Sequence, residues 1–573
     1  MAYAFEEFKN EIITQLNKLL SSSKVELKIE FAPEGMGDFS FPCFSLSSVL
    51  KKSPNEIAKD LSVKIKKGKW IKKSEVKGGY INFHINEFLL IKKTFDSILD
   101  LDGRFGYLEK KKKKVIIEHT SANPNGPLHV GRARNPIIGD TFVRIFKAAG
   151  YDVESQFYLD DMGKQVAILT WGIDNINKDD ISKPKIKKPD HESVVYYQQA
   201  NKLMEKDEDI KREIGVIVKK SEQGDKETIK LIHESYKPVL EGINESLNKI
   251  NIKIDKYIPE STFVKNKSVD SIVKSLKKSK FCREEDGAFY LDLKSFGVKG
   301  RNTKFFFLRR DGTTLYATRD IAYHKWKSRN SDILINVLGE DHKLESKQVE
   351  ITLKLLGEKR VPKAVFYSFV SLPSGKMSTR KARVVYLDEL IEECIERAYC
   401  EVKKRRHGEL SEEKMKEIAE VVGIGSLRYN IIKVQPEKDI IFKWEEALNF
   451  EGNAVPFIQY AHARACSILT KTDIDNLQFD PRLLSHESEL KLIKQLAKLP
   501  LYIEEASARY KPHIITNYLF ETASKFNQFY RDCPVLSEKN TSLRSSRLIL
   551  VNTVRIVIKN SLNLLGITAP EEM

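Results

Sequence analysis

Two stretches of the chain carry the residue types that nucleotide chemistry requires. The first, SANPNGPLHVGRARNPIIGD at 121–140, follows the apolar run VIIE and leads into a helix-like segment. Backbone N–H groups at a helix N-terminus bind phosphate. His129 could donate to the charge that develops on a transferred phosphoryl group, and Gly131 leaves room for a flat ring against the backbone. This stretch predicts a nucleotide phosphate site.

The second stretch, SLPSGKMSTRKARVVYLDEL at 371–390, places Lys376, Arg380 and Lys381 on a Ser/Gly-containing loop after the apolar run AVFYSFV. Cations on such a loop could close over a triphosphate. Each short match is weak by itself, and an ordinary basic surface loop is the alternative. The two stretches support each other because both follow apolar strand-like runs of one sheet.

The elements that would position these loops alternate between strand-like and helical patterns from residue 110 onward. This rhythm predicts a parallel sheet with crossover helices. Residues from about 172 to 295 are Lys/Glu-rich and mostly helical, which predicts an insertion in the sheet, and nearly everything after Tyr386 predicts a helical bundle. The expected strands lie in VIIEHT, VESQFYL, TKFFFLR, ILINVLG and AVFYSFV.

The first hundred residues predict a small α/β domain. Phe5, Phe8, Ile12 and Leu16 recur at helical spacing. VELKIEF at 25–31 and GGYINFHI at 78–85 have strand-like patterns, and Ser53-Pro54 is typical of a helix start. The five lysines at 110–114 are expected to form a solvated linker or to contact phosphate.

Composition limits the partners and the compartment. The 573 residues include 97 Lys+Arg and 80 Asp+Glu, and the natural targets of this formal charge of +17 are nucleic acid or an anionic membrane surface, with a solvated basic face as the alternative. No apolar run is long enough to span a bilayer, since even 548–558 is interrupted by Arg555. MAYAFEEFKNEII lacks the pattern of a signal peptide, so a cytoplasmic location is expected. Six cysteines without a C-x-x-C pattern predict reduced core thiols, with neither a disulfide framework nor a zinc site.

GPLHVG and KMSTRK resemble the two signatures of class I aminoacyl-tRNA synthetases, and the chain as a whole resembles an arginyl-tRNA synthetase of the archaeal type. The matching segments run in order along nearly the whole chain: EGMGDFSFP (34–42), GGYINFHI, TTLYATRDIAYHKWK (313–327), VLGEDHK (337–343), QYAHARACSIL (459–469) and LGITAPEEM.

The resemblance implies an α/β multidomain fold. Residues 1–109 would form an N-terminal domain that binds the tRNA D-loop. Residues 110–400 would form a Rossmann-type parallel-sheet catalytic domain with the helical insertion at about 172–295. Residues 401–573 would form an all-α anticodon-binding bundle. An arginine-selective site needs no editing domain, so the insertion is expected to be structural or to contact tRNA.

The resemblance also implies the reaction, which is ATP-dependent formation of arginyl-adenylate with release of pyrophosphate, followed by transfer to the 3' end of tRNA(Arg). ATP with Mg²⁺ would be a substrate, and no structural metal is expected. A guanidinium group requires acids that match its planar fork of donors. The implied arginine site is Glu118, Asn123, Tyr316 and Asp320; the implied ATP site is His129, Gly131, Arg132, Asp341, His342, Lys376, Met377, Ser378 and Arg380; the implied catalytic residues are His129, Arg132, Lys376 and Lys381.

Two RNA surfaces follow from the same resemblance. Tyr80 and Asn82 match residues that stack on and hydrogen-bond a D-loop base. In the bundle, Phe457, Tyr460, Tyr530 and Met573 match residues of the anticodon pocket. The alternative for each aromatic residue is an ordinary place in a hydrophobic core. The expected enzyme is a monomer that does not bind membranes, although its oligomeric state and its tRNA isoacceptors are not encoded in any motif.

Three positions depart from the family pattern. Arg132 replaces the second signature histidine, Pro136 follows four residues later, and Ala382-Arg383 replaces Gly-Asn. If one helix ran through both of the first two positions, Pro136 would cost up to about 3 kcal/mol. Arg132 is still a cationic donor that could bind ATP phosphate. An active enzyme is expected, with a catalytically impaired paralogue that still binds tRNA as the alternative. A cysteinyl or class I lysyl synthetase is disfavoured, and the cysteinyl enzyme would need zinc-binding cysteines.

Overall fold

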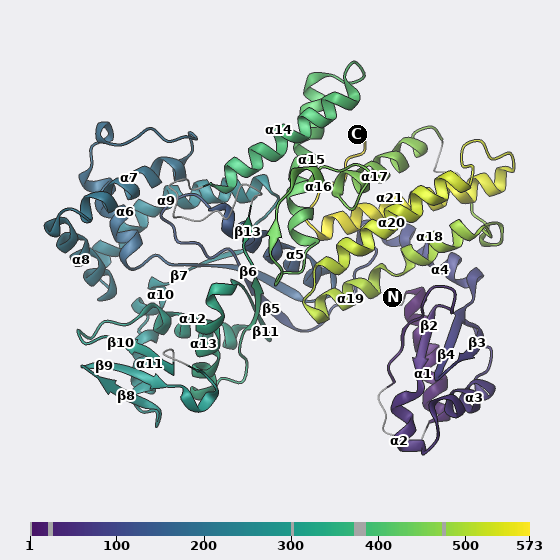
Figure 1. The fold of residues 1–573 in the computed structure, drawn as a ribbon, viewed down its shortest axis with the longest axis horizontal. Coiled ribbons are helices and arrows are strands. Elements are labelled where there is room, and N and C mark those ends of the chain that lie inside the picture. Colours follow the sequence, from purple (N-terminus) through teal and green to yellow (C-terminus); the bar gives the residue numbers. More distant parts are fainter. Residues whose placement is uncertain (1–2, 21–26, 300–302, 372–384, 473–476) are drawn as a thin grey trace.

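The centre of the molecule is a five-stranded, all-parallel sheet (Figure 1). The structure is a computed structural model, and it describes residues 3–20, 27–299, 303–371, 385–472 and 477–573. The strand order is β12-β11-β5-β6-β7. The strands are β5 (Lys114–Glu118), β6 (Asp152–Leu159), β7 (Lys256–Pro259), β11 (Ile333–Gly339) and β12 (Lys363–Tyr367).

The chain order makes the position between β5 and β11 the switch point of this sheet. From β5 the chain proceeds through helix α5 (Arg134–Ala148) to β6 on one side, whereas β11, α13 (Lys343–Leu355) and β12 extend the sheet on the other. Open parallel sheets bind ligands beyond the carboxyl ends of the strands at such a point. The α/β fold class predicted from the sequence is therefore confirmed.

One strand prediction is wrong. TKFFFLR was expected in the parallel sheet, but β10 (Lys304–Leu308) pairs antiparallel with β9 (Ala288–Asp292), which pairs antiparallel with β8 (Cys282–Glu285). A short buried apolar run has the same local pattern in either kind of sheet, so its pairing partner is not encoded within it. The fifth parallel strand is β7, which lies inside the span expected as an insertion and pairs with β6.

The segment between β6 and β7 is helical, as its composition predicts. It forms a group of helices on one side of the sheet (Figure 1, left). Apolar residues of the first three of these helices form a small core of their own, which includes Trp171, Met204 and Ile214, whereas those of the fourth belong to the main core. The helices are α6 (Lys164–Asn175), α7 (Pro189–Met204), α8 (Glu208–Glu222) and α9 (Lys226–Lys249).

The N-terminal region is a four-stranded antiparallel sheet with helices, set apart at the lower right of Figure 1. The predicted first helix is α1 (Ala4–Leu19), which buries Phe5, Phe8 and Ile12. Ser53 caps α3 (Pro54–Lys64) with a reciprocal capping box, so the Ser-Pro helix start is confirmed. The other elements are β1 (Glu30–Phe31), β2 (Phe39–Pro42), β3 (Ile71–Lys77), β4 (Tyr80–Ile85) and α4 (Glu87–Leu101).

The C-terminal region is helical, and a buried arginine joins it to the part of the chain that forms the parallel sheet and its helices. Arg428 donates to the Asp140 carboxylate on α5 over 2.5 Å and to the carbonyls of Ile250 and Leu565. No helix in the described part of the chain is long and apolar enough to cross a membrane. The main helices are α14 (Leu387–Arg406), α15 (Glu412–Ile432), α17 (Val455–Leu469), α18 (Glu487–Ala497), α19 (Leu499–Arg509), α20 (His513–Asp532) and α21 (Thr541–Leu564).

Candidate active site

A cavity of about 260 Å³ opens beyond the carboxyl ends of the parallel strands. The ends of β5 and β11, on either side of the switch point, contribute Glu118 and Gly339 to its wall, and the segments after β6 and β7 contribute Asp160 and Glu260. The start of α12 (Tyr316–Asn330) closes another side. Seven residues expected in the arginine and ATP sites line this one cavity: Glu118, Asn123, Arg132, Tyr316, Asp320, Asp341 and His342.

The first signature forms a turn before the helix and is not part of it. Residues Val130–Arg132 form a single 3₁₀ turn, and α5 begins at Arg134. Pro136 is therefore in the first turn of α5, where a backbone N–H has no partner within the helix in any case. The condition for a costly interior proline is not met. The two departures, Arg132 and Pro136, lie in different elements.

His129 lies in this turn, beside the cavity. Its Nδ1 accepts a hydrogen bond from the Gly131 N–H over 3.0 Å. The neutral ring must then carry its proton on Nε2, which stays available as a donor. Burial and the charge of Arg132 lower the pKa of His129, which favours this neutral form. The backbone at 128–130 pairs with residues 385–387, so the end of the second signature segment is attached to the first.

Arg132 itself is exposed on the cavity wall. Arg132 is near enough to affect the pKa of both His342 and Tyr367. Burial raises the pKa of Tyr367, and the charge of Arg132 opposes this rise. Its position gives the cavity a permanent cation on the side of the β11 and β12 strand ends. A phosphate group placed there would be attracted to it.

Sequence reasoning missed two residues that hold the turn in place. The buried guanidinium of Arg134 donates to the carbonyls of Ser368, Lys438 and Gln435 at 2.7, 2.7 and 3.0 Å. Asn135 accepts from the Thr120 N–H and donates to the Val337 carbonyl, joining the loop after β5 to β11. Polar residues at the start of a helix are common, so the sequence only weakly indicated that Arg134 and Asn135 hold this turn.

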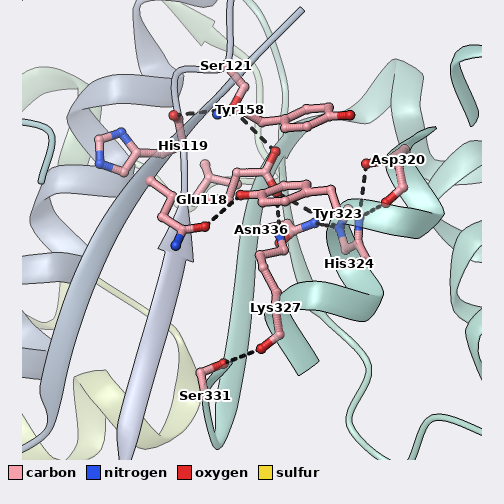
Figure 2. A network of polar contacts seen from close by, with 12 residues as sticks. Glu118, His119, Ser121, Tyr158, Asp320, Tyr323, His324, Lys327, Ser331 and Asn336 are labelled. Carbon is pink, nitrogen blue, oxygen red and sulfur yellow. Dashed lines mark hydrogen bonds and ion pairs between the residues drawn. The ribbon is translucent and has the colours of Figure 1, made fainter. Parts of the chain in front are cut away.

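The two acids expected at the cavity, Glu118 and Asp320, have different partners. Glu118 is buried, and its Oε2 accepts from the Lys327 ammonium over 2.5 Å. Asp320 accepts from the ring of His324 over 2.9 Å. Burial alone would raise its pKa, but the interaction with His324 and the charge of Lys327 lower the pKa of Asp320 below its usual range. Figure 2 shows these groups as one polar network.

Glu260 and Tyr158 are cavity residues that the sequence analysis did not find. One oxygen of Glu260 accepts from Nε of Arg319 over 2.6 Å, whereas the other has no donor among the described residues. Burial, opposed by Arg319 and reinforced by the Asp160 charge, holds the pKa of Glu260 well above its usual value. The buried hydroxyl of Tyr158 also has no partner in the described part of the chain. Recognition of β7 as a sheet strand would have indicated Glu260, because it directly follows that strand.

The second signature falls outside the described residues. Lys376, Met377, Ser378, Arg380, Lys381 and the Ala382-Arg383 pair all lie within 372–384. On the near side of this range, β13 (Val370–Ser371) pairs with β14 (Ile440–Ile441). On the far side, α14 begins at Leu387.

The predicted RNA residues occupy different environments. Tyr80 is 40% exposed and meets the ring of Phe44, which is 52% exposed, edge to face at 5.1 Å. Asn82 on the same strand is buried and accepts from Ser40. The pair of exposed rings on the N-terminal sheet fits a stacking platform.

In the bundle, a cavity of about 410 Å³ is lined by Tyr460 and Met573, as expected, and also by Arg405 and Arg406. The guanidinium of Arg464 lies 4.8 Å from the Tyr460 ring centre and 5.4 Å from that of Tyr530. Phe457 instead packs on Phe520 at 5.6 Å. Three of the four expected residues therefore surround one basic and aromatic region.

A possible metal site elsewhere is better explained as an ion-pair cluster. Among the described residues, Asp190, His191 and Asp388 have ligand atoms close enough for a metal ion. The Lys188 ammonium, however, lies 3.2 Å from Asp190 and 2.8 Å from Asp388, so a cation already occupies this position.

Four of the six cysteines expected as core thiols are buried, whereas Cys282 is half-buried and Cys400 is exposed.

The parallel sheet and its cavity are those of a class I aminoacyl-tRNA synthetase. Residues 94–444 match the family of class I (R) tRNA synthetase catalytic domains. Residues 6–85 match the arginyl-tRNA synthetase N-terminal domain, and residues 458–573 match the DALR anticodon-binding domain. The chain belongs to the arginyl-tRNA synthetase family, and its activity is that of an ATP-dependent arginine–tRNA ligase.

Individual relatives cover almost the whole chain. The arginine–tRNA ligase of Methanocella arvoryzae is 48% identical over 532 residues, 92% of each chain. That of Methanosarcina barkeri is 40% identical over 99% of this chain and all of the relative. The solved arginyl-tRNA synthetase of Thermus thermophilus has a TM-score of 0.83 and 27% identity, with 99% of both chains covered.

Proposed function

We propose that arginine is activated in the cavity between the ends of β5 and β11. The observation that carries the proposal is the convergence there of seven residues expected for arginine and ATP. In the first step the arginine carboxylate attacks the α-phosphorus of ATP and pyrophosphate leaves. In the second, a terminal ribose hydroxyl of tRNA attacks the arginyl carbonyl and AMP leaves. Both steps need positioning and charge stabilisation more than covalent chemistry by the protein.

The side chain of arginine is held by the acidic part of the cavity. Asp320 is ionised and partly open, and Glu260 presents an oxygen without a donor. Two such acids match the donors of a guanidinium group. Tyr316, which is 58% exposed at the start of α12, covers the entrance. Glu118 can offer only Oε1, since Oε2 belongs to Lys327, and this oxygen and Asn123 are placed to hold the amino end.

ATP binds on the side of the signature turn. His129 donates from Nε2, Gly131 admits the base, and Arg132 offers its charge to the phosphates. Asp341 and His342, in the turn after β11, face the nucleotide from the other strand end. Lys376, Met377, Ser378, Arg380 and Lys381 would complete the triphosphate site, and Mg²⁺ would accompany ATP as part of the substrate.

The tRNA contacts the enzyme at its N-terminal region and at its C-terminal helical bundle. Tyr80, supported by the buried Asn82 on the same strand, serves the D-loop. Tyr460, Tyr530 and Met573, with Phe457 supporting them, serve the anticodon of tRNA(Arg). The +17 charge favours such a polyanion. A monomer has every part of the site within one chain, and we propose a cytoplasmic monomer.

Exchange between ATP and pyrophosphate, with arginine and tRNA present, tests the proposal. The enzyme should catalyse arginine-dependent exchange. His129→Ala should reduce kcat about 10²-fold, as expected when one charge-stabilising donor is lost. Arg132→His should remain active because Arg132 and Pro136 lie in separate elements.

Absence of exchange in the enzyme and in Arg132→His alike would refute the proposal and favour the impaired tRNA-binding paralogue. Rescue only by Arg132→His would identify Arg132 as the defect. No feature of the described residues favours the impaired alternative.

A further inference from the structure

A fully buried lysine lies directly behind the wall of the proposed arginine cavity. The Lys327 side chain has no exposed surface, and its ammonium donates to Glu118 Oε2 over 2.5 Å and to Asn336 Oδ1 over 2.9 Å. The ring of Tyr323 lies 4.2 Å from the ammonium nitrogen. The lysine does not line the cavity, so direct contact with substrate is not its role.

The ammonium determines the orientation of the Asn336 amide. An ammonium group only donates, so the oxygen of the amide must face it. The amide nitrogen then points at His324 Nε2, 2.6 Å away. Since that nitrogen donates, Nε2 must accept, and the neutral imidazole carries its proton on Nδ1.

His324 Nδ1 lies 2.9 Å from Asp320 Oδ1 and 2.8 Å from the Asp320 carbonyl. The proton fixed on Nδ1 is therefore directed at Asp320, the partly open acid of the cavity. A chain of hydrogen bonds thus connects two acids on different walls through Lys327, Asn336 and His324. Figure 2 shows this chain running from Glu118 at the end of β5 to Asp320 on α12.

A second contact joins the lysine to the cavity. Tyr323, beneath the ammonium, stacks on Tyr158 with ring centres 4.3 Å apart and planes within 4°. Tyr323 is itself held by a hydrogen bond to Gln156. Tyr158 lines the cavity and carries the hydroxyl without a partner.

We propose that Lys327, acting through Asn336 and His324, is the positioning residue that orients Glu118 and Asp320 for arginine. It occupies Oε2 of Glu118, so that a ligand meets Oε1, which also accepts from the Ser121 hydroxyl over 3.3 Å, and it directs a donor at Asp320. Each acid therefore has one fixed orientation. It also balances part of the charge of a cavity lined by Glu118, Asp160, Glu260, Asp320, Asp341 and Glu345. Fixed acids bind arginine without first losing side-chain freedom.

The inference rests on the proposed arginine cavity, and aminoacylation kinetics test it. Lys327→Met and Asn336→Leu should each raise KM for arginine about tenfold, which corresponds to about 1.4 kcal/mol. KM for ATP should stay within about twofold, since the nucleotide side of the cavity is not part of the chain of hydrogen bonds. The double variant should be no worse than the more damaging single one, because both substitutions interrupt one chain.

Lys188→Met is the matched control. It also removes a buried lysine that pairs with an acid, but Lys188 lies in the ion-pair cluster with Asp388, which does not line the cavity. It should lower the thermal stability as Lys327→Met does and leave KM for arginine unchanged. If Lys327→Met fails to fold, Asn336→Leu carries the test.

Lys327→Met or Asn336→Leu with an unchanged KM for arginine would overturn the inference. So would additive effects in the double variant, because they would show two independent contributions. Glu118→Gln and Asp320→Asn separate this failure from that of the proposed function. If these two variants raise KM and the interior variants do not, only the inference fails; if none of them raises KM, the arginine cavity is misplaced.

Discussion

Two buried clusters in this enzyme are built from nearly the same residue types. The cavity cluster contains Glu118, Lys327, Asn336, His324 and Asp320, whereas the closed cluster contains Asp190, Lys188, Asp388, His191 and Ser246. Each places one lysine ammonium against carboxylates and adds a histidine and a neutral polar group.

The clusters differ in what surrounds them. In the closed cluster the side chains of Lys188, Asp190, His191 and Asp388 are at most 6% exposed, and the residues come from α7 and its N-cap, from α9 and from α14. In the cavity cluster Lys327 is fully buried, but 23% of the Asp320 side chain is exposed at the cavity. In the closed cluster the charged groups pair with one another, and these contacts join α7, α9 and α14. The cavity cluster leaves one acid open to a ligand, so access to a cavity separates a binding site from a structural ion pair.

The largest effect should come from the open acid. Asp320→Asn should lower kcat/KM for arginine about 10²–10³-fold, because the guanidinium loses its ionic partner in a partly desolvated site. Steady-state aminoacylation at saturating ATP and tRNA measures this. Asp270→Asn, an exposed acid-to-amide change on α11 (Ser268–Lys277), is the control and should have no effect. An equal loss in both variants would contradict the comparison.

The closed cluster should respond in stability instead. Burial favours the neutral acid, but hydrogen bonds from His191 and Lys188 hold the pKa of Asp388 well below its usual range. Asp388→Asn should therefore cost about 3 kcal/mol of unfolding free energy at pH 7, because the buried Lys188 loses the nearer of its two carboxylate partners. Thermal or denaturant unfolding measures the loss.

The sign of the pH dependence follows from this lowered pKa. An acid whose folded pKa is depressed contributes its stability above the unfolded pKa of about 3.9, and this contribution disappears as the pH falls toward the folded value. The difference between the enzyme and Asp388→Asn should thus shrink below about pH 4. KM for arginine should be unchanged at pH 7. A raised KM with intact stability would reverse the roles assigned to the two clusters.

A smaller effect is expected from the buried acid beside the cavity cluster. Glu260 has a raised pKa and lies beside Asp160, Arg319 and Tyr158. Arg319 also pairs with Glu222. Bound guanidinium favours the carboxylate, so binding releases a proton wherever the free site is protonated. KM for arginine should rise as the pH falls, by at most tenfold (about 1.4 kcal/mol) per pH unit for one proton. Glu260→Gln should remove this slope, and a slope that persists would assign it to another group.

The sequence could predict the local parts of the site but not its non-local pairing. Tyr316 and Asp320 were predicted correctly to share a helix start, since their spacing of four is a local property. His324 and Lys327 continue this helical face at spacings of four and three residues, so the sequence pattern could have predicted their positions behind the cavity. Their polar character was not enough to distinguish them from surface residues of a helix.

Glu260 and the strand TKFFFLR show the limit of local patterns. Which strands pair depends on contacts between segments far apart in the chain, and β7 and β10 could have exchanged roles without any change in their own alternation. The predicted cost of Pro136 was wrong for the same reason, because contacts between distant segments determine where α5 begins. Its predicted cost assumed a helix through Arg132, whereas a single 3₁₀ turn and the buried Arg134 contacts set the helix start two residues later.

The smallest effect is expected where the functional groups are exposed. Tyr460 is 42% exposed, lines the anticodon-side cavity and is partnered by Arg464. Tyr460→Ala should weaken tRNA binding by about 1 kcal/mol, at the low end of base–aromatic stacking, because an exposed ring loses little burial. Filter binding at fixed salt measures this, and KM for arginine should not change. Tyr107→Ala, 45% exposed outside the cavity, is the matched control. Equal losses in the two variants would mean that exposed aromatic surface in general, and not this basic and aromatic region, binds the RNA.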